Sequence, residues 1–241
     1  MSLNTVSVRL TLEFGPTAVM KTAHRLGIAS KLEPNASIGL GTSEVSVIEL
    51  VSAYAAFANG GMVSTPHVVE RVRTANGKVL YRRVPDSLGR VVDGRYVAMM
   101  NMMMQETLLT GTARKADLPG WPAAGKTGTS QDFRDAWFVG YTAHYVTGVW
   151  LGNDDGSPTH KTTGSGMPVE IWSRVMKTAH HNVAVAGLPG LAGGAAVAGA
   201  TPPAGIPRPQ LADAGGTVPI PAAPARSGLD DWLLGKLFGA R

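Results

Sequence analysis

A short run of cationic and hydroxyl side chains near the middle of the chain constrains the fold most. Residues 126–130, Lys-Thr-Gly-Thr-Ser, lie between a turn-rich segment at 119–122 and an apolar run at 136–141. This order predicts a loop, a strand that carries one ammonium and three hydroxyl groups, and a second strand. Gly128 lets another backbone or a ligand approach the strand closely. Lys126 and the hydroxyls of Thr127 and Thr129 suit a small anion such as a carboxylate, although an ordinary edge strand with a solvated lysine has the same pattern.

Helical and strand patterns surround this run. Pro16 and Gly27 mark the two ends of one helix, and Thr42 or Ser43 is expected to cap a second, largely buried helix that ends at 59–61. The other predicted elements are a hairpin of strands at 68–73 and 78–83 with one solvated face, a helix from Asp93 to about Leu109, strands at about 124–130, 135–142 and 144–153, and a helix from Val169 to about Asn182. The last two strands lie close in sequence and should pair antiparallel. The fold class is therefore α/β of the α+β type, an antiparallel sheet flanked by helices.

The composition changes at about residue 184. The chain holds 30 Gly and 16 Pro in 241 residues, and from Ala184 onward it has few charges and few large apolar side chains. Such a segment buries too little apolar surface to offset the entropy of ordering it. We therefore predict a folded domain over residues 1–183 and a Pro/Gly/Ala-rich disordered tail over 184–241, with a short apolar helix at about 229–238.

Charge and cysteine content exclude several kinds of function. The chain has no cysteine and a net charge of +5, so it has no disulfide framework and no thiolate chemistry. Basic residues gather between Arg71 and Arg95 without interleaved aromatics, which predicts a solvated face, or one near anionic lipid or wall polymer, and no nucleic-acid partner. His180 and His181 would diverge by ~100° on a helix, and Asp154-Asp155 fits a turn. We expect no metal site and no cofactor.

The order of the motifs is more specific than any one of them. Ser2-Leu3-Asn4 precedes Lys126-Thr127-Gly128 by a long stretch with helical patterns. Ser-x-Asn followed by Lys-Thr-Gly in this order resembles the transpeptidase domain of class A (bifunctional) penicillin-binding proteins. Further segments that resemble this family are 4–10, 39–45, 53–61, 110–113, 135–141 and 148–155. The resemblance runs from about Ser2 to about His181.

The resemblance implies a penicillin-binding/β-lactamase-like transpeptidase fold and a serine-type D,D-transpeptidase reaction. In that reaction a serine attacks a D-alanyl-D-alanine stem peptide of peptidoglycan, and β-lactam antibiotics imitate this substrate. It implies that Ser2 relays a proton, that Asn4 binds the substrate amide, that Lys126 supplies positive charge, and that Thr127-Gly128-Thr129 binds the substrate. The family works at the periplasmic face of the inner membrane, but neither a signal peptide nor a membrane anchor is visible in this sequence.

One part of the family pattern is absent from this sequence. The nucleophile of the family lies in Ser-x-x-Lys, and no serine here is followed three residues later by a lysine. We therefore expect an N-terminally truncated domain, doubtful as an enzyme on its own, for which a polypeptide carrying the N-terminal half would be a further partner. The alternatives are a noncatalytic module that binds wall peptide or a partner, a relative of β-lactamases or D,D-carboxypeptidases, and a remnant without a stable fold. The lactamase motif Glu-x-x-Leu-Asn has no match, since residues 106–110 read Glu-Thr-Leu-Leu-Thr.

Overall fold

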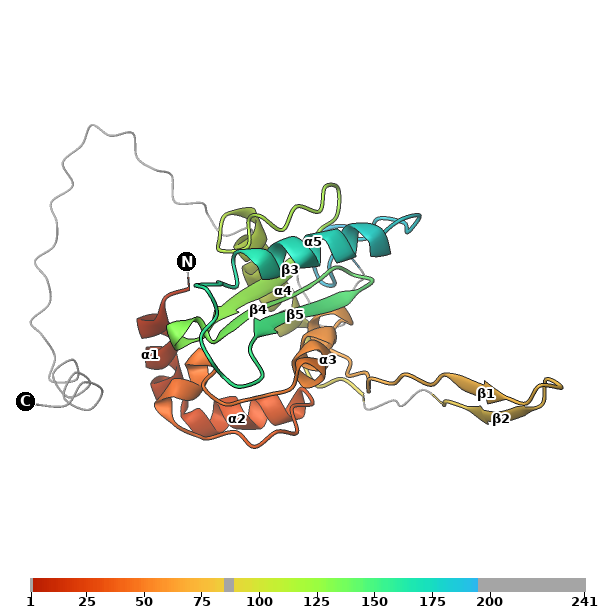
Figure 1. Ribbon diagram of the computed structural model, residues 1–241, viewed down its shortest axis with the longest axis horizontal. Helices are drawn as coiled ribbons and strands as arrows, with labels where there is room; N and C mark the ends of the chain where they lie inside the picture. Colours follow the sequence, from red (N-terminus) through yellow and green to blue (C-terminus); the bar gives the residue numbers. More distant parts are fainter. Residues whose placement is uncertain (1, 85–88, 195–241) are drawn as a thin grey trace, which may run out of the picture. The chain divides into compact units, whose positions relative to one another are not determined.

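A three-stranded antiparallel sheet lies at the centre of the fold. The computed structural model describes residues 2–84 and 89–194 (Figure 1). The strands β3 (Ala124–Thr129), β4 (Asp135–Tyr141) and β5 (Val146–Gly152) follow each other in the order β3-β4-β5. A short 3₁₀ turn, η2 (Gln131–Phe133), joins β3 to β4. All three predicted strands are confirmed to within a few residues, as is the antiparallel pairing of β4 with β5.

Helix α5 (Met167–Ala179) covers one face of the sheet. Trp172 is fully buried, and its Nε1 donates to the carbonyl of Gly140 at 3.0 Å. Its ring meets Phe138 edge-on, with ring centroids 5.2 Å apart. A Cβ on Gly140 would lie 2.9 Å from both rings, so glycine is needed for this close packing. The helix begins two residues before the predicted Val169, because Pro168 is accommodated in its first turn.

Helices α3 (Val47–Ala58) and α4 (Gly94–Leu109) pack on the other face. A Cβ on Gly148 of β5 would lie 2.5 Å from Val51, which shows how closely α3 approaches. Tyr54 meets the buried Tyr141 edge-on, and Met104 of α4 joins the same cluster. Burial raises the pKa of Tyr54 to about 12. Helices thus flank the sheet on both sides, as the sequence predicted.

The start of α3 differs from the prediction. Ser46, and not Thr42 or Ser43, is the N-cap, and it forms a capping box with Glu49. The Glu49 carboxylate also accepts from Ser30 Oγ at 2.7 Å, and these bonds lower its pKa to about 2. The helix is less buried than predicted, since Ala53 and Ala56 are buried, its other residues from Glu49 onward are half-buried, and Ile48 is 56% exposed. Besides the sheet, the helix packs through Ala53 on a cluster of Ile28, Leu32 and Ile38, and only Val47 and Ile48, in its first turn, are exposed.

Two helices precede this core. The α2 helix (Pro16–Arg25) confirms the prediction. The α1 helix (Asn4–Phe14) was missed, because its apolar residues do not follow one clear helical stripe together with a capping residue. Its buried Thr11 faces the 3₁₀ helix η1 (Ala36–Leu40), where a Cβ on Gly39 would lie 2.1 Å from the Thr11 hydroxyl oxygen.

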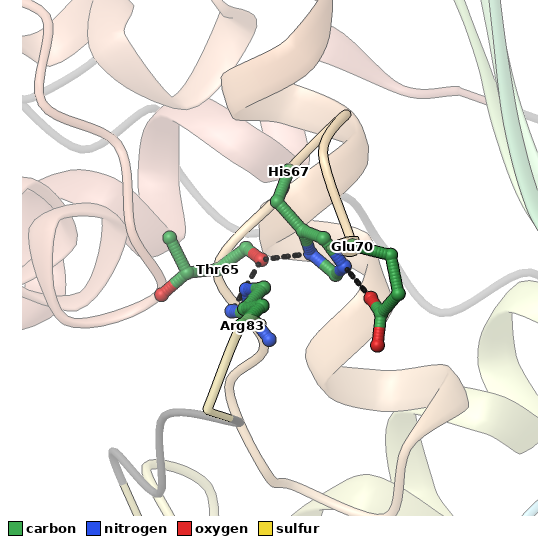
Figure 2. A network of polar contacts seen from close by, with 4 residues as sticks. All are labelled: Thr65, His67, Glu70 and Arg83. Atoms are coloured by element: carbon green, nitrogen blue, oxygen red, sulfur yellow. Dashed lines mark hydrogen bonds and ion pairs between the residues drawn. The ribbon is translucent and has the colours of Figure 1, made fainter. Parts of the chain in front are cut away.

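The predicted hairpin is shorter than expected. Strands β1 (Arg71–Arg73) and β2 (Val79–Arg82) pair antiparallel, and every residue in them is exposed. The prediction of a single solvated face was therefore wrong. Polar contacts tie its base together, since His67 binds both the Thr65 carbonyl and the Glu70 carboxylate, and Arg83 donates to the same carbonyl (Figure 2). Among the described residues, no helix is long and apolar enough to cross a membrane.

The chain remains packed beyond residue 183. Leu188 is fully buried in the cluster of Met104, Ala124 and Tyr141. The Pro189 carbonyl accepts from Asn101 Nδ2 at 2.9 Å. Composition alone had placed this segment in a disordered tail, and the few large side chains it contains are the ones that anchor it. The tail and helix predicted for 195–241 lie outside the described residues.

Candidate functional site

Lys126 joins the beginning of the chain to the central sheet. Its ammonium donates to Ser2 Oγ at 3.3 Å and to the carbonyl of Thr127 at 2.7 Å. The two side chains are separated by 124 positions in sequence, so only the tertiary fold can bring them together. Partial burial lowers the pKa of Lys126, because desolvation disfavours the charged form. Among the described residues, this ammonium has no carboxylate within ion-pair distance.

A pocket of about 200 Å³ lies beside this pair. Ser2 and Lys126 line one part of it, and the end of α4 with the following turn lines the rest. The lining residues of α4 and the turn are Met103, Glu106, Thr107, Thr110, Gly111 and Thr112. Cationic, carboxylate and hydroxyl groups thus surround one small hollow, a set that can bind a polar ligand and pass a proton along it.

The last turn of α4 and the turn that follows it are each fastened to β3. Thr107 Oγ1 donates to the carbonyl of Gly125, and Thr112 Oγ1 lies 2.6 Å from Thr127 Oγ1. Gly111 permits this path, because a Cβ there would lie 2.7 Å from the backbone of Thr107. The hydroxyl of Thr127 is therefore held in a defined position by a residue outside its own strand.

Gly164 allows its loop to approach β3 closely. A Cβ on Gly164 would lie 2.3 Å from the carbonyl oxygen of Gly128, so the two backbones are in contact. The amide of Gly164 donates to Thr129 Oγ1 at 3.0 Å. A backbone thus lies against Gly128, but the glycine that permits this contact is Gly164, since a Cβ on Gly128 would meet only the side chain of Trp137, at 3.3 Å.

A second hollow of about 470 Å³ adjoins this loop. It is lined by Thr110 to Thr112 on one side, by Thr163, Ser165 and Gly166 on the other, and by the two basic residues Arg114 and Lys115. It shares the Thr110–Thr112 turn with the first pocket. Hydroxyls and cations therefore line both hollows beside β3.

The predicted site residues are brought together unequally. Ser2 reaches Lys126, whereas Asn4 is the exposed first residue of α1, and its side chain makes no hydrogen bond within the described part of the chain. The N-cap of α1 is Leu3, without a side-chain bond. Thr112 and Gly164 were not predicted as site residues. The segment 110–113 could have indicated Thr112, because it was among those that resemble the family.

Comparison with known proteins places this geometry in a family. The family model for the penicillin-binding protein transpeptidase domain matches residues 1–177. The chain belongs to this transpeptidase family. The expected α+β transpeptidase fold and the resemblance to class A penicillin-binding proteins are thereby confirmed.

Relatives of this transpeptidase domain include whole penicillin-binding proteins. Penicillin-binding protein 1A of Aquifex aeolicus (strain VF5) is 37% identical over 177 residues, which cover 73% of this chain and 24% of the relative. Penicillin-binding protein 1A of Neisseria meningitidis (strain MC58) is 33% identical over 185 residues, with 74% and 23% covered. The chain thus spans about a quarter of the length of these curated relatives.

Solved structures share the fold. Penicillin-binding protein PonA1 from Mycobacterium tuberculosis is 33% identical, with a TM-score of 0.72 over 78% of this chain and 56% of that one. PonA1 has also been solved in complex with penicillin V, with a TM-score of 0.68 over 76% of this chain and 55% of that one. Penicillin-binding protein 1A from Haemophilus influenzae, at 22% identity and a TM-score of 0.68 over 77% of this chain and 34% of that one, shares the fold alone.

Proposed function

We propose that this chain provides the Lys-Thr-Gly strand and the Ser-x-Asn motif of a serine-type D,D-transpeptidase site that acts on D-alanyl-D-alanine stem peptides of peptidoglycan. The observation that carries the proposal is the bond between Lys126 Nζ and Ser2 Oγ. It unites the two motifs at a polar pocket. β-Lactam antibiotics would occupy the same place as the substrate.

Each side chain has a role that follows from its surroundings. Lys126 is partly desolvated, so its positive charge acts more strongly on a nearby anion than it would in water. Ser2 can receive a hydrogen bond from this ammonium while its own hydroxyl proton is donated elsewhere, which suits a proton relay. The lowered pKa of the Lys126 ammonium also makes it easier for Lys126 and Ser2 together to give up a proton near neutral pH.

The substrate carboxylate would bind along Thr127-Gly128-Thr129. When Thr112 donates to Thr127, the proton of the Thr127 hydroxyl is free to point to a ligand oxygen. The backbone N–H of Thr129 would serve as one donor of the oxyanion hole, a role typically worth about 3–4 kcal/mol of transition-state stabilisation. Asn4 would bind the substrate amide once a ligand occupies the site.

The nucleophile must come from another segment. The sequence contains no Ser-x-x-Lys, and acyl transfer needs an activated nucleophile together with the oxyanion hole. We infer that a polypeptide segment carrying Ser-x-x-Lys completes the site. The reaction of the assembled protein would take place outside the inner membrane, where the stem peptides are cross-linked.

A fusion tests the proposal directly. The part of the PonA1 transpeptidase domain that carries its Ser-x-x-Lys motif is joined upstream of Ser2, and the product is incubated with a fluorescent penicillin. We expect labelling that survives denaturation in the fusion and none in the present chain alone. Lys126→Gln should slow labelling by about 10²–10³-fold, the cost of losing one electrostatic contact to the transition state.

Lys177→Gln is the matched control. Lys177 forms an exposed ion pair with Asp117 at 2.8 Å, away from the pocket, so its variant should label at the parent rate. Equal labelling of the Lys126→Gln and Lys177→Gln fusions would contradict the proposal. If the fusion does not fold, the proposal is tested by equilibrium titration of the present chain with N-acyl-D-alanyl-D-alanine. An affinity for this peptide that Lys126→Gln leaves unchanged would also contradict the proposal.

A further inference from the structure

The hairpin of β1 and β2 presents basic and apolar side chains together without a partner. Arg71 lies directly opposite Arg82 in the antiparallel register, and Val72 lies opposite Tyr81. All of these residues are exposed. A two-stranded hairpin is marginally stable in water, and like charges placed opposite each other weaken it further. An anionic binding partner would therefore stabilise the hairpin, because it would reduce the repulsion between the paired arginines.

The positive charges are not neutralised within the described part of the chain. Arg71, Arg73, Lys78 and Arg82 form no ion pair there. The nearest carboxylate in sequence, Glu70, is bound to His67 Nε2 at 2.9 Å (Figure 2). The guanidinium groups are therefore available to an external anion, for which they offer several N–H donors each.

Apolar side chains on the same segment need cover as well. Val72, Val79 and Tyr81 are 41%, 43% and 48% exposed, and Leu80 is 61% exposed. Val68 and Val69 beside the hairpin are exposed too. Successive side chains of a strand point to opposite faces, so Leu80 shares a face with Arg82, while Val72 and Tyr81 lie on the other face. Each face of the hairpin therefore exposes apolar side chains to water. A nucleic acid would satisfy the cations but would leave the aliphatic side chains in water.

We propose that this hairpin binds the surface of an anionic lipid bilayer. Phosphate head groups would pair with Arg71, Arg73 and Arg82, while Leu80, on the same face as Arg82, enters the boundary between head groups and acyl chains. The hairpin would thereby hold the domain at the membrane independently of the Lys126 pocket.

Vesicle binding by the full chain tests this inference. We expect the chain to sediment with vesicles of phosphatidylcholine and phosphatidylglycerol at 3:1, to stay in solution with phosphatidylcholine alone, and to be released by 0.5 M NaCl. The triple variant Arg71→Gln/Arg73→Gln/Arg82→Gln should bind about a hundred-fold more weakly, since each basic residue near an anionic surface contributes about fivefold. Leu80→Ser should weaken binding by about tenfold.

The controls are matched in charge and in exposure. Arg9→Gln/Lys21→Gln/Arg25→Gln removes three exposed charges elsewhere and should bind like the parent, as should Ile48→Ser on α3. Circular dichroism confirms that each variant folds.

Equal binding of the two triple variants would overturn the proposal, because the attachment would then lie elsewhere in the chain. A lack of binding to the anionic vesicles would overturn it as well. So would a concentration-dependent dimer that only the hairpin variants abolish, since a second copy would then cover this surface.

Discussion

The buried amide of Asn101 connects three parts of the fold, and its replacement gives a sharp test of the packing. Its Oδ1 accepts from the Tyr141 hydroxyl at 2.6 Å, and its Nδ2 donates to the Pro189 carbonyl at 2.9 Å. Asn101 and Tyr141 are both fully buried. The network thus ties α4 to β4 and to the segment that follows α5.

The cost of each change follows from the groups left unpaired. Asn101→Leu leaves the Tyr141 hydroxyl and the Pro189 carbonyl without partners, and at about 1–3 kcal/mol for each group this amounts to about 2–6 kcal/mol. Tyr141→Phe leaves only the Asn101 oxygen unpaired, which costs about 1–3 kcal/mol. The double variant has no Tyr141 hydroxyl to leave unpaired, so it loses only the bonds from Asn101 Nδ2 to the Pro189 carbonyl and, at 3.4 Å, to the Phe57 carbonyl. The double variant should therefore be more stable than Asn101→Leu alone.

Urea unfolding of the four proteins, followed by tryptophan fluorescence, measures this cycle. Tyr141→Phe combined with Ser173→Ala is the control pair. Ser173 donates to the carbonyl of Asp117 and shares no bond with Tyr141, so the losses of unfolding free energy in these two variants should add. Additive costs for Asn101→Leu and Tyr141→Phe would refute the reasoning, since the two side chains would then not share a buried bond.

Three further predictions concern the strand of the site. Thr112→Val should slow penicillin labelling of the fusion by up to about tenfold, because it removes one hydrogen bond, while Thr112→Ser keeps the parent rate. If Thr112→Val labelled at the parent rate, Thr112 would have no role in positioning Thr127. Lys126→Met should be more stable than the parent at pH 8, because burial lowers the pKa of Lys126. The parent gains stability as the pH rises from the lowered pKa of folded Lys126 toward the unfolded value of about 10.4, above which both states are deprotonated. Urea midpoints of the two proteins that do not converge toward pH 11 would contradict this. Gly164→Ala should cost about 1–3 kcal/mol in thermal unfolding, because its Cβ meets the backbone of Gly128, and an unchanged Tm would show that the loop can move.

Local chemistry was sufficient to predict most of the elements. Asp93 caps α4 as expected, with its side chain accepting from the Arg95 amide, and Pro16 begins α2. The start of α3 was misplaced because several hydroxyl residues precede it, and only the one with Glu49 three positions later can form the reciprocal cap. The exposure of the hairpin and of α3 was misjudged because an apolar pattern indicates which side chains favour burial, but it does not show whether another segment packs against them.

The sequence by itself determined the strand of Lys126, the flanking helices and the family, because capping, turn residues and alternation act over a few positions and the motifs can be read in order. Only the tertiary structure decided that Ser2 lies against Lys126, that Thr112 holds Thr127, and that Leu188 belongs to the core. These contacts join residues far apart in the chain or on different elements. They depend on how the sheet and helices pack, and no local pattern encodes that packing.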